Sequence, residues 1–216
     1  MTDTRYIFGG KLPWQPSEWV TSDDRVRGGS SQSHLTVSDP SKARFHGNLD
    51  TSTLGGAGFA SQYSAGSLDL DLSDYDGIVL DVIEASDHKR YALTIKDNIP
   101  PRRGDGRLKS TVTWEAEFKP SGPGEIFLPW DDFKATYRGK DRPEEEPLDL
   151  KSIKRIGIMM RSFFDEQDGD FSIELRSIAA QRVSDDEADD IKQYHKHSPI
   201  AEKRSGWKSL FCGLLG

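Results

Sequence analysis

Residues 77–84 read GIVLDVIE, and this stretch shows most directly how the chain folds. Ile78, Leu80 and Val82 share one side of an extended segment, because successive side chains of a β-strand point to opposite faces. Apolar residues at every second position, enriched in β-branched side chains, are typical of a half-buried strand. The stretch therefore predicts a β-strand that turns Ile78, Leu80 and Val82 toward a core.

The same period of two recurs further along the chain, and clusters of Gly, Pro, Asp and Ser separate the apolar rows. Such clusters indicate hairpins and loops rather than crossover helices. The sequence therefore predicts an all-β fold, a jelly-roll antiparallel β-sandwich with a short C-terminal helical tail. The expected inward rows are Tyr91, Leu93 and Ile95; Val112, Trp114, Ala116 and Phe118; Ile156, Ile158 and Met160; and Phe171, Ile173 and Leu175.

Composition divides the chain into three segments. Residues 1–18 are expected to form an N-terminal extension, 19–182 the β-sandwich, and 183–216 an acidic helix followed by a basic amphipathic tail. Apolar side chains at helical spacing in the tail predict contact with a membrane surface, whereas docking onto the sandwich or a partner is the alternative. The side chains assigned to membrane contact are Trp207, Leu210, Phe211 and Cys212, the last as a site of reversible acylation.

Charge and cysteine content exclude several classes of protein. The formal net charge of -7 repels phosphate backbones, so we expect no nucleic-acid partner. A single cysteine, Cys212, excludes an internal disulfide framework and a zinc site built from cysteines. The N-terminus, MTDTRYIFGG, lacks the apolar core of a secretory signal and the Arg- and Ser-rich character of a mitochondrial presequence. Either the sequence is already mature or the protein stays in the cytosol.

A search for catalytic motifs finds none. The five histidines are scattered, and we interpret them as solvated side chains rather than metal ligands. No nucleophile elbow or phosphate-binding loop is present. The acidic pairs Asp131–Asp132 and Asp165–Glu166 suit a glycosidase only if a fold sets their spacing, and exposed loop acids are the commoner case. The sequence therefore predicts a binding protein that is not an enzyme and has no catalytic residue, metal or cofactor.

Two loops are candidate binding sites. In residues 19–31, Gly28 and Gly29 permit a positive φ and a close approach of the backbone, while Asp23 and Asp24 either tie down a rigid turn or offer oxygens to a hard cation. We expect Asp23, Asp24, Arg27 and Ser30 to contribute to binding.

The second loop spans residues 128–139. Here Trp130 and Phe133 bracket two acids, and Arg138 supplies a bidentate donor. The aromatic pair either seals the edge of the sandwich or belongs to a recognition surface, and the binding residues expected are Trp130, Asp131 and Arg138.

The order of several motifs resembles the thirty-kilodalton complex I intermediate-associated protein family. The motifs are SDDRVRGGSSQS, FHGNLDTSTLGGAGFAS, LDLSDYDGIVLDV, YALTIKD, TVTWEAEF, LPWDDFKATYRGK, PLDLKSIKRIGIMMRS and GDFSIELRSI. The matching positions are Asp23, Gly28, Gly29, Ser30, Gly47, Gly58, Phe59, Asp76, Gly77, Trp114, Phe118, Pro129, Phe133, Arg138, Gly139, Arg161, Gly169, Asp170 and Phe171.

This resemblance implies a galactose-binding-like sandwich and adds Arg161 to the expected binding residues. It also implies a mitochondrial assembly factor or chaperone that binds unfolded or partly built intermediates of NADH:ubiquinone oxidoreductase. Protein partners are therefore expected. A carbohydrate- or small-ligand-binding module outside mitochondria is the alternative.

Overall fold

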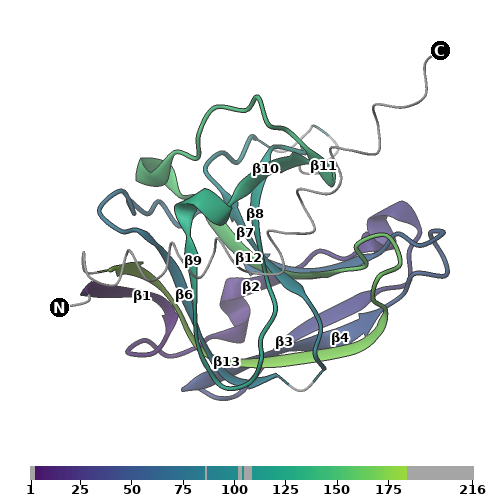
Figure 1. The fold of residues 1–216 in the computed structure, drawn as a ribbon, viewed down its shortest axis with the longest axis horizontal. Helices are drawn as coiled ribbons and strands as arrows, with labels where there is room; N and C mark the ends of the chain where they lie inside the picture. Colours follow the sequence, from purple (N-terminus) through teal and green to yellow (C-terminus); the bar gives the residue numbers. More distant parts are fainter. Residues whose placement is uncertain (1–2, 86, 102–103, 105–108, 184–216) are drawn as a thin grey trace. The chain divides into compact units, whose positions relative to one another are not determined.

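The computed structural model describes residues 3–85, 87–101, 104 and 109–183, which form two antiparallel β-sheets (Figure 1). The six-stranded sheet contains β1 (Asp3–Gly9), β3 (Gln32–Asp39), β4 (Lys42–Leu49), β6 (Gly77–Ala85), β9 (Gly124–Pro129) and β13 (Gly169–Arg182). The seven-stranded sheet contains β2 (Trp19–Thr21), β5 (Phe59–Ser64), β7 (Tyr91–Lys96), β8 (Thr113–Phe118), β10 (Lys134–Tyr137), β11 (Lys140–Asp141) and β12 (Arg155–Arg161). Four short 3-10 helices join them: η1 (Pro16–Glu18), η2 (Asp24–Arg27), η3 (Trp130–Asp132) and η4 (Leu150–Ser152).

Strands that are distant in sequence lie side by side in both sheets. The first sheet has the order β3-β4-β13-β6-β9, with β1 also paired to β13, and the second has β11-β10-β8-β7-β12-β5-β2. The chain therefore crosses repeatedly between the sheets, as in a jelly roll, and the predicted fold class is confirmed. The predicted acidic helix and amphipathic tail fall within residues 184–216, outside the described part of the chain.

The predicted inward rows form the core between the two sheets. Leu93 lies opposite Ile158 in the seven-stranded sheet, Ile173 lies opposite Phe45 in the six-stranded sheet, and all four are buried. Each fully buried aliphatic side chain contributes about 1.5–3 kcal/mol relative to an exposed one. The period of two therefore located the core correctly along these strands.

The described sandwich begins before Trp19. Strand β1 pairs with β13, and Phe8 and Trp14 are buried in the core. The ring centroid of Trp19 lies 4.8 Å from that of Phe8 and 5.8 Å from that of Trp14. The alternation was not visible in β1 because its only fully buried apolar side chain is Phe8.

Candidate functional site

Asp23 and Asp24, which we call the aspartate clamp, lie at the start of η2 and are buried despite their charge. The Oδ2 atom of Asp24 accepts hydrogen bonds from Ser31 Oγ at 2.6 Å and from the Phe59 amide at 3.2 Å. Its Oδ1 atom accepts from the Ser31 amide at 3.1 Å. Asp24 therefore joins η2 to the segments that lead into β3 and β5.

Asp23 makes a parallel set of bonds one residue earlier. Its Oδ1 atom accepts from Ser33 Oγ at 2.6 Å and from the Ser61 amide at 2.9 Å, and its Oδ2 atom accepts from the Ser33 amide at 3.0 Å. A buried carboxylate is costly unless hydrogen bonds replace its hydration, and these donors do so. The clamp therefore fixes the backbone of three chain segments.

The paired glycines after η2 have the two uses expected of them. Gly28 has φ +84°, in the left-handed region, and caps η2 with its N–H bonded to Arg25 O at 3.1 Å. A Cβ atom on Gly29 would come within 2.3 Å of Asp24 Oδ1. Only glycine therefore lets the chain pass so close to the buried carboxylate.

Of the four residues of this loop that were expected to bind, Arg27 and Ser30 are exposed. The guanidinium of Arg27 lies 5.6 Å from the centroid of the Phe59 ring, and Ser30 Oγ is 3.2 Å from Thr53 Oγ1. Across the described ranges, no group of three or more His, Cys, Asp or Glu side chains is arranged to hold a metal ion. The polar groups of the loop are thus directed at protein donors or at solvent.

The second loop places its aromatic residues against the core. The indole Nε1 of Trp130 donates to Tyr75 O at 2.6 Å, and the Trp130 ring centroid lies 5.6 Å from that of buried Phe133. Asp131 and Arg138 are exposed, and Arg138 Nε donates to Ser110 Oγ at 3.3 Å.

The two loops do not form one site. Strand β13 pairs with the end of β4 at Gly169↔Leu49 and with the start of β6 at Gln181↔Gly77. The aspartate clamp lies beyond the first of these ends, and Trp130 follows Pro129, which pairs with Gly77 at the second. The expected binding residues therefore belong to opposite ends of the sandwich.

Arg161 lies on the outward face of β12 within an ion-pair network. Its Nη1 atom is 2.8 Å from Glu115 Oε2 and its Nη2 atom is 2.6 Å from Glu117 Oε1. The ring of Phe163 has Arg161 at 4.4 Å and Arg90 at 3.6 Å from its centroid. Cation–π contacts of this kind contribute about 0.5–2 kcal/mol each. Arg161 thus supports the turn that follows it.

That turn has an unusual backbone. Phe163, Phe164 and Asp165 have φ values of +49°, +59° and +70°, and all three lie in the left-handed region. Each such residue costs roughly 1–2 kcal/mol when it is not glycine. The Gln167 amide donates to Ser162 O at 3.2 Å and closes the turn. Sequence reasoning missed this geometry, because glycine is the residue that signals it and none is present here.

The side chain of Gln167 holds the turn to both flanking strands. Its Nε2 atom donates to Arg90 O at 2.7 Å and to Arg161 O at 2.8 Å, while its Oε1 atom accepts from the Arg90 amide at 3.0 Å. These bonds satisfy backbone groups that β7 and β12 leave unpaired at their ends. The turn is therefore fixed in spite of its strain.

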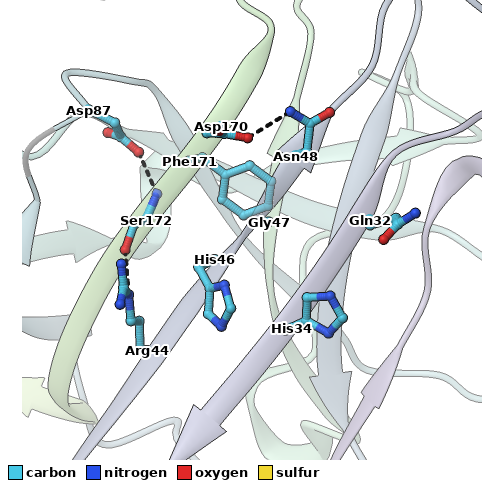
Figure 2. Close-up of a pocket in the computed structure, with 10 residues that line it drawn as sticks. All are labelled: Gln32, His34, Arg44, His46, Gly47, Asn48, Asp87, Asp170, Phe171 and Ser172. Carbon is cyan, nitrogen blue, oxygen red and sulfur yellow. Dashed lines mark hydrogen bonds between the residues drawn. The ribbon is translucent and has the colours of Figure 1, made fainter.

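A shallow depression of about 550 Å³ lies on the outer face of the six-stranded sheet, over β3, β4 and β13 (Figure 2). Most of the side chains that form it stand at alternate positions of the three strands, which are the positions that point away from the core. Its lining residues are Gln32, His34, Arg44, His46, Gly47, Asn48, Asp87, Asp170, Phe171 and Ser172.

Two histidines stand side by side in this depression, as Figure 2 shows. His34 lies directly opposite His46, with ring centroids 5.5 Å apart. Partial burial, followed by the charges of Arg44 and His34, lowers the pKa of His46. Arg44 Nε donates to Ser172 Oγ at 2.8 Å. The face thus presents two adjacent imidazoles beside a tethered guanidinium.

The floor of the depression is anchored to the core. Asp87 Oδ2 accepts hydrogen bonds from the Ser172 amide at 2.8 Å and from the hydroxyl of buried Tyr91. Burial, and then the bond to Asp87, raises the pKa of Tyr91 far above its ordinary value. Tyr91 therefore remains a neutral donor that positions Asp87.

The arrangement suits recognition of a polar ligand, since imidazole and amide groups both donate and accept hydrogen bonds. We interpreted His34 and His46 from the sequence as scattered. The register of β3 and β4 brings them together, and no local pattern encodes that register.

Lys96 is a half-buried cation on the outer face of the seven-stranded sheet. Its ammonium donates to Thr111 Oγ1 at 2.9 Å and to Val112 O at 3.2 Å. Burial, and then the nearby charge of Arg155, lowers the pKa of Lys96 to about 8. The fold therefore makes this side chain lose its proton at a lower pH than an exposed lysine does.

Comparison with known proteins shows one matching family. The family model described as Complex I intermediate-associated protein 30 (CIA30) matches residues 8–175. The chain is also 40% identical over 182 residues to the uncharacterized protein C9E9.15 of Schizosaccharomyces pombe, covering 81% of this chain and 82% of that protein. The family match confirms the resemblance that the motifs indicated.

Among solved structures, the chain is similar to carbohydrate-binding modules of Clostridium thermocellum. A family 11 module in complex with a β-1,3-1,4-mixed-linked tetrasaccharide is 14% identical, with a TM-score of 0.55 over 82% of this chain and 94% of that one. The family 11 module of a cellulosomal cellulase is 15% identical, with a TM-score of 0.51 over 83% and 94% of the two chains. At these identities the likeness shows the fold alone. In the described part of the chain, no helix is long and apolar enough to cross a bilayer.

Proposed function

Because the chain belongs to the complex I intermediate-associated protein 30 family, we propose that it is a non-catalytic binding protein that assists assembly of mitochondrial respiratory complex I. In this role it acts as a chaperone that holds partly built, incompletely folded intermediates in the mitochondrion. Its partners are other proteins, and the tail beyond residue 183 adds a membrane-surface contact.

The observation that carries this proposal is the extent of the family match. Residues 8–175 include most of the apolar core, the aspartate clamp and both loop regions, so the similarity follows most of the sandwich. The proposed binding groups of the loops are of two kinds. Asp23 and Asp24 shape the backbone from within, while Arg27, Ser30, Asp131 and Arg138 stand exposed at the surface.

Deletion of the gene in its native organism tests the proposal. Membranes solubilised in mild detergent are resolved on native gels and stained for NADH dehydrogenase activity. We expect less assembled complex I and an accumulation of subcomplexes, both restored by re-expression of the full chain. Normal levels of assembled complex I would refute an assembly role.

Binding of a carbohydrate or another polar small ligand is a second candidate function. The observation that favours it is the depression over β3, β4 and β13, which gathers hydrogen-bond donors and acceptors on a fold shared with carbohydrate-binding modules. Sugar hydroxyls require such mixed partners, because each both donates and accepts.

Titration with the β-1,3-1,4-mixed-linked tetrasaccharide and a glycan array tests this second function. In the depression, Asn48 Nδ2 donates to Asp170 Oδ1 at 2.8 Å, so Asn48→Ala removes one polar group from the lining. We expect roughly tenfold weaker binding from this loss, with no change in Asn98→Ala, a matched substitution outside the depression. An array without a single reproducible binder would end the carbohydrate hypothesis.

A further inference from the structure

The two most exposed large apolar side chains of the described residues lie at one end of the sandwich. Four large apolar residues are classed as exposed: Val20 (38%), Leu12 (46%), Phe164 (80%) and Val26 (83%). Only Val26 and Phe164 are more than half exposed, and both occupy the tips of tight turns. Single exposed apolar residues are common on protein surfaces, so their placement decides whether they matter.

The turns that carry Val26 and Phe164 adjoin the same intervening loop. The Ser162 amide donates to Gly58 O at 3.0 Å, and a Cβ atom on Gly56 would lie 3.4 Å from Asp165 Cβ. On the other side of this loop, Ser30 Oγ lies 3.2 Å from Thr53 Oγ1. Figure 1 shows the three loops together beyond the ends of β3 and β4. We call this surface the loop end.

Both apolar tips rest on rigid supports. Val26 lies in η2, whose first residue, Asp24, is held by three hydrogen bonds to Ser31 and Phe59. Phe164 lies in the left-handed turn that Gln167 ties to two strands. A side chain whose backbone is already fixed loses less entropy when it binds. Backbone strain that the surroundings maintain is also more frequent at functional sites than elsewhere.

Charge distinguishes the two tips. Arg25 and Arg27 flank Val26 and are exposed, although the chain as a whole carries a formal charge of -7. Beside Phe164 stands exposed Asp165. Groups complementary to the loop end are therefore acidic on the Val26 side.

We propose that the loop end is a protein-docking surface on which Val26 and Phe164 insert into apolar cavities of a partner, with partner carboxylates placed to meet Arg25 and Arg27. Projecting apolar and aromatic side chains of this kind supply most of the binding energy when they enter a desolvated pocket. The inference rests on the proposed function in requiring a protein partner. It does not require that the partner belong to complex I.

Photo-crosslinking in cells tests the proposal. The full chain carries p-benzoylphenylalanine at position 26 or 164, and at position 12 as the control. Leu12 is the next most exposed apolar residue and lies at the other end of β3, near the turn where Trp14 N bonds to Pro40 O at 2.8 Å. We expect one and the same protein, identified by mass spectrometry, at positions 26 and 164, with at least about tenfold lower yield at position 12.

The crosslinking results test the docking surface and the proposed assembly function separately. A complex I subunit at positions 26 and 164 supports both. A different protein at both positions supports the docking surface, and normal complex I on native gels then removes the assembly role. The docking surface is overturned if positions 26 and 164 give no protein adduct, a lipid adduct only, a second copy of this chain, or yields equal to position 12. Complex I that still depends on the gene in that case leaves the proposed function standing.

Charge reversal provides the second measurement. Arg25→Glu combined with Arg27→Glu leaves Val26 in place, so any loss of adduct reports the partner's charge rather than a missing anchor. We expect at least a roughly tenfold lower yield at position 164 from a chain that stays folded, with a melting temperature lowered only by the loss of the Arg27–Phe59 contact. Unchanged adduct yield would contradict the acidic groups assigned to the partner.

Discussion

The loop end of the sandwich inverts the usual distribution of side chains. Beneath the surface, Asp24 is 0% exposed and its carboxylate accepts three hydrogen bonds. At the surface, Val26 and Phe164 are more than three quarters exposed. Within the same group of loops, the charged side chain of Asp24 is therefore buried, whereas the apolar side chains of Val26 and Phe164 are exposed.

This difference in burial distinguishes residues that stabilise the fold from residues available for binding, which the sequence alone does not do. The buried carboxylates hold three chain segments together and therefore bear on the free energy of unfolding. The exposed apolar side chains bury almost no surface in the folded chain, so they have little to contribute to its stability. The comparison implies that substitutions below the surface affect folding and that substitutions above it affect binding.

The largest expected effect comes from Asp24→Ala. The substitution leaves the amides of Ser31 and Phe59 without their acceptor, and the Ser31 hydroxyl keeps only the longer bond to Asp50 O at 3.3 Å. Each unsatisfied buried donor costs about 1–3 kcal/mol, so we expect the free energy of unfolding to fall by about 3–4 kcal/mol. Urea denaturation followed by tryptophan fluorescence measures it.

Asp131→Ala is the matched control for the clamp. Asp131 also belongs to a pair of acids at a 3-10 helix, but its side chain is exposed. We expect a change within about 0.5 kcal/mol. Equal losses in the two variants would mean that burial does not distinguish the two acidic loops.

The second largest loss of stability is expected at Gln167, which holds the turn that carries Phe164. Gln167→Ala removes two donations to backbone carbonyls and one acceptance from a backbone amide. We expect a loss of about 2 kcal/mol and faster hydrogen exchange at the Gln167 amide, which bonds to Ser162 O. Unchanged exchange at that amide would show that the left-handed turn does not depend on this side chain.

Lys96 extends the comparison from buried acids to a half-buried cation. Its pKa falls from 10.5 to about 8 on folding, so between these values the unfolded chain binds more protons than the folded one. Stability therefore rises with pH across this window, and the penalty is complete below pH 8. Lys96→Met abolishes that rise. We expect the difference in free energy of unfolding between wild type and variant to change by about 2–3 kcal/mol between pH 8 and 10.5. A difference that stays constant with pH would contradict the burial of this ammonium.

The smallest effect tests the strain at the surface. Phe164 has φ +59°, a conformation that glycine adopts freely and alanine does not. We therefore expect Phe164→Gly to be more stable than Phe164→Ala by roughly 1 kcal/mol, the reverse of the usual order in helices and strands. Thermal unfolding of the two variants measures the difference. Alanine at least as stable as glycine would refute the left-handed turn.

Agreement between sequence and structure is greatest in the strands. The period of two placed Leu93, Ile158 and Ile173 in the core, and each is buried. The prediction for the first loop was also confirmed, since Gly28 adopts the positive φ expected of it. Strand β1 was not predicted, because most of its side chains are only partly buried and its pairing depends on β13, which is far along the chain.

The candidate sites were less predictable than the fold. Asp23–Asp24 and Asp131–Asp132 are both acidic pairs in loops, and nothing near either pair in the sequence tells which is buried. The donors that stabilise Asp24 include an amide from Phe59, which reaches it only when β5 is in place. His34 and His46 likewise meet through the register of two strands.

Alternation along a strand is a property of neighbouring residues, and it was enough to specify an all-β sandwich and the inward side of each principal strand. The family could also be identified from the order of local motifs. Burial of the aspartate clamp, pairing of the histidines and display of Phe164 arise from contacts between segments that are far apart in the chain. Such contacts depend on long-range register, which residue spacing does not encode.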